Sequence, residues 1–196
     1  MTALLSTTFF GPVQWYQKLV RHPHVLIERH DSYVKQTYRN RCLIAATSGV
    51  QALTVPVTVE NSTVRVSDHG NWRHQHWQAL CSAYGDSPFF QYYEDDIRPF
   101  FTERWEFLYD HNEAIRQTMC QLLDIAPSVD YTSYYIKDAD GIVDYRDAIR
   151  PKHPLPDAEF APRRYYQVYE RKHGFLPNLS ILDLLFNMGP ESIFFL

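Results

Sequence analysis

Short apolar segments separated by turn residues open the chain and predict strands with one helix between them. Ala3 to Thr8 is apolar and rich in β-branched residues, as strands are. After Gly11-Pro12, apolar residues recur at helical spacing from Val13 to Val20. A second strand is expected from Val25 to Glu28. The opening pattern is therefore strand, turn, helix, strand.

A hairpin is the next expected element. Its two strands cover residues 41–46 and 52–57 and are joined by a turn at Ser48-Gly49. Pro56 has no amide hydrogen to donate, so the second strand should lie at a sheet edge or end there.

The middle of the chain is predicted to be mainly helical. Apolar residues repeat with a helical period from Trp72 to Tyr84, and Ser87-Pro88 is typical of the start of another helix, over residues 89–93. The segment Asp110-x-x-Glu113 has the spacing of a capping box, which predicts the start of a third helix.

The C-terminal third is expected to consist of long ordered loops, because prolines exclude long helices there. Short strands fit residues 131–136 and 165–169, and a last helix runs from Ser180 to Asn187, before Gly189-Pro190. We therefore predict an α/β or α+β fold with a mixed sheet packed against helices, in a single domain over residues 1–196. The interrupting prolines are Pro151, Pro154, Pro156, Pro162 and Pro177.

Composition supports a folded domain in a reducing compartment. Of the 196 residues, 45% are hydrophobic and 21% are charged, which is ordinary for a globular protein. The 3 cysteines form no C-x-x-C pair, and an odd number argues against a disulfide framework. The chain opens without a signal peptide and has no apolar run of about 18 residues, so we expect a cytoplasmic protein without a membrane span. A net charge of -4 disfavours nucleic acid as a partner.

Strong short motifs are absent from the sequence: there is no G-x-G-x-x-G, P-loop, H-E-x-x-H or G-x-S-x-G. His74-x-His76 could hold a metal on a strand, but a helix is expected there, and a helix turns the two side chains about 200° apart. Asp138-x-Asp140 resembles the metal-binding Asp-x-Asp of many glycosyltransferases, yet an Asp-Gly turn needs the same residues. We predict no metal site, and the sequence does not tell whether a cofactor is used.

The densest polar cluster runs from Lys35 to Arg41, between two expected strands. It combines guanidinium, ammonium and amide donors, which suit a phosphate or a carboxylate. The alternative is an edge strand protected by its charges. The candidate anion-binding residues are Lys35, Asn40 and Arg41, together with Arg146 and Lys152 from the proline-rich loop.

Three residues are candidates for catalysis. His76 and Tyr84 share one face of the expected helix and could form an acid and base pair, although a histidine packed in the core is the commoner case. Ser180-x-x-Asp183 is most simply a capping box, since the sequence places no base beside a catalytic Ser-Asp pair. The candidates are His76, Tyr84 and Asp183.

With these residues the chain resembles the WbqC-like family, whose naming associates it with O-antigen and other surface-glycan biosynthesis. The resemblance covers most of the length, and its departures are Ser6-Thr7, where many members have Gln-Pro, and Arg29-His30, where many have an acidic pair. The segments that carry it are Phe9-Phe10 to Lys18, Tyr33-Val34-Lys35, Tyr38 to Ile44, Leu53 to Val57, Trp72, His76, Tyr84, Ser87 to Phe90 and Leu179 to Pro190.

The resemblance implies a pathway more than a reaction. The leading hypothesis is an enzyme, a group transferase that acts on a nucleotide-activated sugar or another phosphorylated glycan precursor. The alternative is a non-catalytic binding or scaffolding module of a glycan pathway, with the cationic cluster as its docking patch. RNA binding through Tyr38 to Arg41 is a third hypothesis, which the acidic net charge disfavours.

Overall fold

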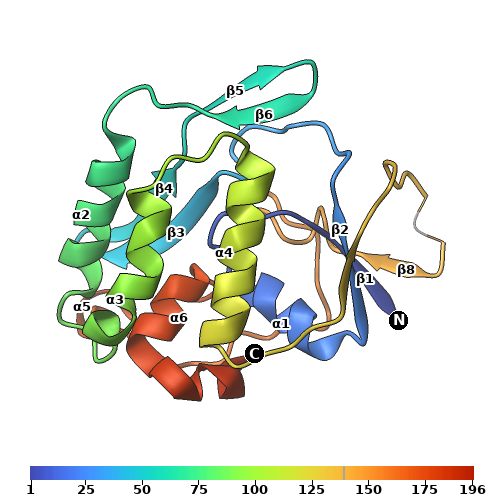
Figure 1. Cartoon of the computed structure of the whole chain (residues 1–196). Coiled ribbons are helices and arrows are strands. Elements are labelled where there is room, and N and C mark those ends of the chain that lie inside the picture. Colours follow the sequence, from blue (N-terminus) through green and yellow to red (C-terminus); the bar gives the residue numbers. More distant parts are fainter. Residues whose placement is uncertain (139) are drawn as a thin grey trace.

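A parallel sheet of four strands lies at one side of the molecule (Figure 1). The computed structural model describes residues 1–138 and 140–196. The strand order is β7-β2-β1-β8, and every neighbouring pair is parallel. The strands are β1 (Thr2–Ser6), β2 (His24–Glu28), β7 (Val129–Tyr131) and β8 (Ile142–Asp144).

The central strand β1 is covered on both faces. Ala3, Leu4 and Leu5 are fully buried, which explains why this strand reads as an apolar run without alternation. The chain then turns through Gly11, where a Cβ atom would come within 2.4 Å of the Thr8 hydroxyl oxygen, and enters α1 (Val13–Arg21). The predicted order of strand, turn, helix and strand is confirmed.

Two antiparallel hairpins follow. The predicted hairpin is confirmed as β3 (Arg41–Ala46) and β4 (Gly49–Thr54), and the second strand ends before Pro56 as expected. A second hairpin, which the sequence analysis missed, consists of β5 (Val57–Glu60) and β6 (Thr63–Val66). The fold is of the predicted α/β class, with its strands divided between a parallel sheet and two hairpins.

Helices form the rest of the molecule, and in the view of Figure 1 α4 lies between the parallel sheet and α2 with α3. Their aromatic residues meet those of the turn before α1: the Phe10 ring stacks on Phe101, with 5.6 Å between the ring centroids. The helical elements are α2 (Trp72–Tyr84), α3 (Phe90–Ile97), η1 (Arg98–Phe101), α4 (Leu108–Leu122), α5 (Glu170–His173), α6 (Ile181–Met188) and η2 (Gly189–Phe195).

Two predicted helix starts are wrong, although the helices themselves are present. α4 begins at Leu108, so Asp110 lies within its first turn and does not cap it. The Ser87 hydroxyl donates to the Tyr84 carbonyl at 2.6 Å, and α3 starts only at Phe90. Local hydrogen bonds of Ser and Asp to the backbone compete with capping, which is why such pairs mark a boundary only approximately.

Of two further expected strands, one is absent and the other is shorter than predicted. Residues 165–169 form no strand, because side chains from this segment turn inward to the buried Asp183. The strand expected over residues 131–136 is β7 and ends at Tyr131, beyond which the chain folds around the buried Glu28. The strand β8 was not predicted.

The proline-rich segment after β8 is held on α1 by a buried cation. The Lys18 side chain is fully buried, lies 2.8 Å from an Asp157 oxygen and sits 4.4 Å from the Tyr145 ring centroid. The long loop is thus anchored to the side of the sheet that α1 covers. Among the described helices, none has the length and apolar character needed to cross a bilayer.

Candidate functional site

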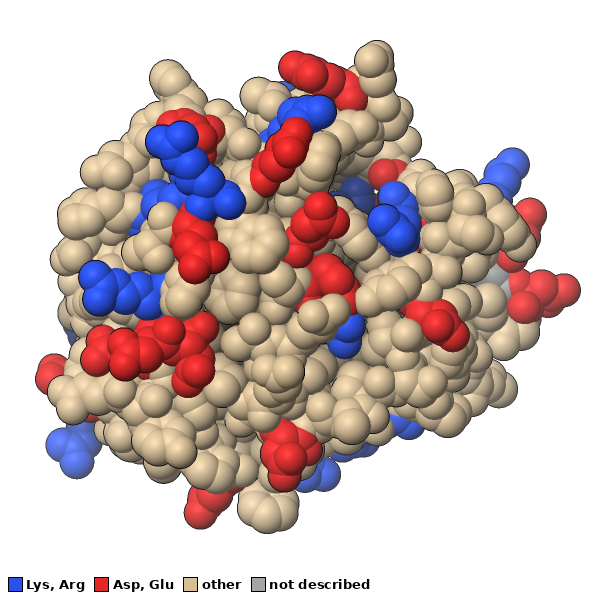
Figure 2. Space-filling model, in the orientation of Figure 1, with Lys and Arg blue, Asp and Glu red and all other residues tan. Residues whose placement is uncertain are grey.

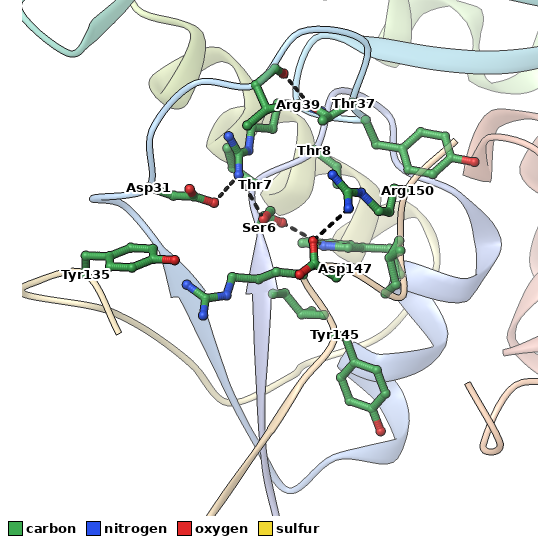
Figure 3. Close-up of a pocket in the computed structure, with 16 residues that line it drawn as sticks. Ser6, Thr7, Thr8, Asp31, Thr37, Arg39, Tyr135, Tyr145, Asp147 and Arg150 are labelled. Carbon is green, nitrogen blue, oxygen red and sulfur yellow. Dashed lines mark hydrogen bonds and ion pairs between the residues drawn. The ribbon is translucent and has the colours of Figure 1, made fainter. Parts of the chain in front are cut away.

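A hollow of about 120 Å³ lies beyond the carboxyl ends of β1 and β8 (Figure 3). We call it the first hollow. Its walls include Ser6, which ends β1, the following Thr7 and Thr8, and five residues that come soon after β8: Tyr145, Arg146, Asp147, Ile149 and Arg150. In the sheet, β1 lies between β2, the next strand along the chain, and β8, the last strand of the chain. The strand order reverses at β1, and parallel sheets bind their ligands beyond the carboxyl ends at such a point.

Arg39 and Asp31 form an ion pair across one wall of the first hollow (Figure 3). The guanidinium also donates to the Ser32 carbonyl at 2.6 Å and to the Ser6 hydroxyl at 3.4 Å. Burial raises the pKa of the Asp31 carboxyl, while the positive charge of Arg39 opposes that rise. A carboxyl with a raised pKa beside a cation in a hollow is a recurring feature of functional sites.

A second ion pair, between Glu28 and Arg146, lies at the same end of the sheet. The fully buried Glu28 carboxylate lies 3.2 Å from an Arg146 nitrogen and accepts from the Thr132 hydroxyl at 2.7 Å. Arg146 also binds the Asp144 carboxylate, and its guanidinium lies 5.0 Å from the Tyr135 ring centroid. Four of the five N–H donors of Arg146 have protein acceptors, so its main contribution is to fix the loop after β8.

Arg150 is the least constrained arginine of the first hollow. One of its nitrogens lies 3.0 Å from Asp147, whose carboxylate is 65% exposed. In residues 1–138 and 140–196, this is the one ion pair that Arg150 makes. The remaining N–H donors of its guanidinium are therefore available to a ligand.

A larger hollow of about 380 Å³ adjoins the first, and we call it the second hollow. It lies between the loop after β2, the β5–β6 hairpin and the start of α4. Thr7, Asp31 and Arg39 line both hollows, so the two adjoin at the carboxyl edge of the sheet, and together we call them the cleft. Acidic and basic side chains are interspersed on the face shown in Figure 2. No broad positive surface covers this face, so an anion would have to be bound by individual arginines such as those of the cleft.

The predicted anion-binding residues are brought together only in part. Arg146 lines the first hollow. Lys152 donates to the side chain of Gln36 at 2.8 Å, which places it beside the exposed loop that carries Lys35. Asn40 is buried and donates to the Val55 carbonyl, and Arg41 donates to the Thr54 hydroxyl at 3.0 Å; both side chains therefore bind the first hairpin.

Tyr84 and Asp183 meet in a fully buried network. The Asp183 carboxylate accepts from the Tyr84 hydroxyl at 2.8 Å, the Tyr165 hydroxyl at 2.7 Å and the Gln167 amide at 2.8 Å. Burial raises the pKa of Asp183, and these hydrogen bonds oppose the rise. Ser180 caps α6 as predicted, and its hydroxyl accepts from the Leu182 amide at 3.3 Å. Asp183 faces inward and takes no part in the cap.

His76 does not join this network. It lies on α2 with its ring 5.2 Å from that of Trp72 and 6.4 Å from that of Phe101, measured between centroids. Burial lowers the pKa of His76 to about 4. Its ring is therefore neutral near pH 7, and its proposed catalytic role, like those of Tyr84 and Asp183, stays a prediction.

No group of three or more His, Cys, Asp and Glu side chains gathers in a metal-binding arrangement anywhere in the described part of the chain. His74 and His76 both lie on α2, where helical geometry separates them. The central residue of the Asp138-x-Asp140 segment, residue 139, lies outside the described residues.

Comparison with protein families gives a match over most of the chain. The model described as the WbqC-like protein family matches residues 8–152. The chain belongs to the WbqC-like family. It is also 27% identical over 189 residues to the uncharacterized protein Rv1507c of Mycobacterium tuberculosis, covering 82% of this chain and 81% of that protein. No solved structure gives a significant match.

Both departures from the WbqC-like pattern fall at the cleft. Ser6 and Thr7 line the first hollow, and Arg29 lines the second.

Sequence reasoning overlooked Asp31, Arg39 and Arg150 as site residues. A signal was available, because Asp31 follows the second predicted strand and Ser6 to Thr8 end the first. Had these strands been taken as parallel, their carboxyl ends would have marked the edge where polar side chains converge. Arg150 follows β8, the strand that the sequence did not predict.

Proposed function

We propose that the protein is an enzyme of surface-glycan biosynthesis that binds a phosphorylated precursor in the first hollow and transfers a group from it. The observation that carries the proposal is the position of this hollow at the carboxyl ends of β1 and β8, with arginines on its wall. The pathway is supported by the naming of the WbqC-like family. An activated sugar joined to phosphate is the precursor class that fits both.

Arg39 and Arg150 supply the charge for the phosphate. Within the described residues, Arg39 uses only its two terminal nitrogens and Arg150 only one of them, so N–H donors remain on both. Guanidinium groups bind phosphate oxygens through paired, charge-assisted hydrogen bonds, each worth about 1.5–3 kcal/mol. The Ser6 hydroxyl, which accepts from Arg39, adds a neutral donor to the same wall.

Asp31 is placed to move the proton. In the transfer, a hydroxyl of the acceptor attacks the sugar carbon, the bond from that carbon to the phosphate oxygen breaks, and its electron pair leaves with the phosphate. Asp31 takes the proton of the attacking hydroxyl, for which its raised pKa makes it a better base than an ordinary aspartate. Arg39, which contacts Asp31, stabilises the negative charge that develops on the departing phosphate.

Binding of inorganic pyrophosphate, measured by calorimetry and by thermal shift, tests the anion site. Arg150→Ala should raise the Kd about tenfold or more, because it removes at least one charge-assisted hydrogen bond. The melting temperature should change little, since the ion pair lost is partly exposed. Arg171→Ala is the matched control, because it removes the same charge from an exposed position on α5, outside the cleft.

Complementation of a surface-glycan defect in cells tests the proton transfer. Asp31→Asn keeps an acceptor for Arg39 but cannot take a proton, so the variant should bind pyrophosphate and fail to restore the glycan. The proposal is wrong if pyrophosphate neither binds nor stabilises the wild type, or if Asp31→Asn complements fully.

A further inference from the structure

Aromatic side chains line the second hollow, which is larger than the first. Tyr33, Phe107 and Tyr109 line it together with the apolar side chains of Val64 and Leu108. Its volume, about 380 Å³, falls in the range of roughly 300–1,000 Å³ that is usual for ligand pockets. Arg39 lines both hollows, but Arg150 does not reach this one, and its aromatic side chains have no part in binding phosphate.

Arg29 lies in the second hollow without a counter-charge. Its guanidinium is 4.7 Å from the Tyr109 ring centroid and 5.8 Å from that of Tyr131. Among residues 1–138 and 140–196, it makes no ion pair with a carboxylate. A guanidinium stacked on aromatic rings keeps its N–H edge free to donate.

The Tyr109 hydroxyl is a second polar group without a partner. Its oxygen is shielded from solvent and makes no hydrogen bond to any described residue. A buried hydroxyl that lacks a partner costs about 1–3 kcal/mol. The second hollow therefore combines aromatic side chains with two arginines, Arg29 and Arg39, and with the acidic residues Glu28, Asp31 and Asp110.

Thr7, Asp31 and Arg39 connect this aromatic part of the cleft to the arginines of the first hollow. A molecule that fills both must carry phosphate at one end and a flat ring with hydrogen-bond acceptors at the other. Nucleobases stack on aromatic side chains and on guanidinium planes, with about 1–3 kcal/mol per base. A sugar ring lacks the flat π-face that would match Arg29 stacked on Tyr109.

We propose that the second hollow binds the base of a nucleotide whose phosphates occupy the first hollow. The inference rests on the proposed function for the position of the phosphates, and it specifies the precursor as a nucleoside diphosphate derivative. Tyr33 and Tyr109 stack with the base, and Arg29 donates to an acceptor on the base edge.

Calorimetry with three probes separates the two parts of the cleft. ADP and UDP should bind at least about tenfold more tightly than inorganic pyrophosphate, since one stacked base adds more than about 1.4 kcal/mol. Tyr33→Ala and Arg29→Ala should each remove most of this gain while leaving the Kd for pyrophosphate within about twofold of wild type. Arg29 is exposed, so its variant tests the hollow even where Tyr33→Ala lowers stability. Tyr92→Ala, which removes a 74% exposed tyrosine on α3, is the matched control.

The outcomes distinguish this inference from the proposed function. If pyrophosphate binds in a manner that depends on Arg150 and nucleotides bind no more tightly, the base subsite is wrong and the phosphate site stands. If nucleotides bind tightly and Arg29→Ala and Tyr33→Ala lose that gain, but Arg150→Ala has no effect, the base subsite stands and the phosphate site is wrong. Equal binding of nucleotides by wild type and both second-hollow variants contradicts the inference directly.

Discussion

Two buried or partly buried carboxylates of this protein have opposite surroundings. Asp183 is fully buried and accepts from two tyrosine hydroxyls and one amide, all of them neutral. Asp31 is paired with Arg39 at the junction of two hollows, and its carboxylate is 19% exposed. Burial raises the pKa of both.

The difference shows that a raised pKa alone does not separate a structural carboxylate from one that can reach a ligand. In the Asp183 network each donor has found its acceptor, and the network joins α2, α6 and the loop before α5. At Asp31 the neighbouring arginines keep N–H donors without acceptors. Hydrogen-bond donors that lack acceptors at an open surface therefore indicate a ligand site better than a raised pKa does.

The largest expected effect is on the Asp183 network. Asp183→Ala should lower the free energy of unfolding by about 3–5 kcal/mol, because it leaves three buried donors without acceptors. Urea denaturation followed by circular dichroism measures this loss. Asp147→Ala, which removes a 65% exposed carboxylate from an ion pair, should cost less than about 1 kcal/mol.

The Asp183→Ala variant can also contradict the contrast between Asp183 and Asp31. If Asp183→Ala keeps the stability of wild type and fails in glycan complementation, Asp183 acts in catalysis, as the sequence predicted. A large loss of stability assigns it to the fold.

The next effect is a dependence of stability on pH through His76. Burial lowers its pKa to about 4 in the folded protein, against about 6.5 in an unfolded chain. Between these values the unfolded chain binds the proton and the folded protein does not, so stability decreases as pH falls from about 6.5 to about 4. His76→Gln should remove about 2–3 kcal/mol of this decrease.

Urea denaturation at pH 7 and pH 4.5 gives the measurement, with His74→Gln, an exposed neighbour on α2, as the control. An unchanged pH dependence in His76→Gln would show that the ring titrates as it does in water. His76→Asn tests the catalytic prediction separately, because a catalytic histidine requires loss of complementation at a near-normal melting temperature.

Much of the local fold could be predicted from the sequence, because local patterns determine it. Helix α2 coincides with the predicted segment Trp72 to Tyr84, and the first hairpin follows from apolar runs around a Ser-Gly turn. Elements with weak local patterns were missed: β8 has three residues, and the hairpin of β5 and β6 is largely exposed. Short strands acquire their conformation from pairing with distant segments, and a single window of sequence carries no such information.

The candidate site depends even more on distant segments. Ser6, Asp31 and Arg150 come from three parts of the chain and meet only because their strands run parallel in the order that the sheet has. The members of the predicted cationic cluster divide: Arg39 lines the cleft, whereas Asn40 and Arg41 bind the first hairpin. Arg39 and Asn40 lie in the turn before β3, where no simple periodicity of the sequence gives the direction of a side chain.

A smaller effect is expected for Arg41→Ala. The side chain is partly exposed and donates one hydrogen bond to Thr54, its partner across the hairpin, so stability should fall by at most about 1 kcal/mol. The Kd for pyrophosphate should change less than in Arg150→Ala, because Arg41 lies outside both hollows. Equal weakening in the two variants would restore Arg41 to the anion site that the sequence predicted.

The smallest perturbation is chemical labelling of the three cysteines, which changes no residue of the cleft. All three are free. Burial raises the pKa of Cys42 to about 12 and that of Cys120 to about 11, and it also raises the pKa of the partly exposed Cys81. Because alkylation requires an accessible thiolate, iodoacetamide at pH 8 should label Cys81 first in the folded protein and the other two only after denaturation.

Intact-mass measurement under non-reducing conditions gives the number of labels, and Cys81→Ser should show none in the native state. A disulfide in the purified protein, or rapid native labelling of Cys42, would contradict the packing of the hairpin against α6.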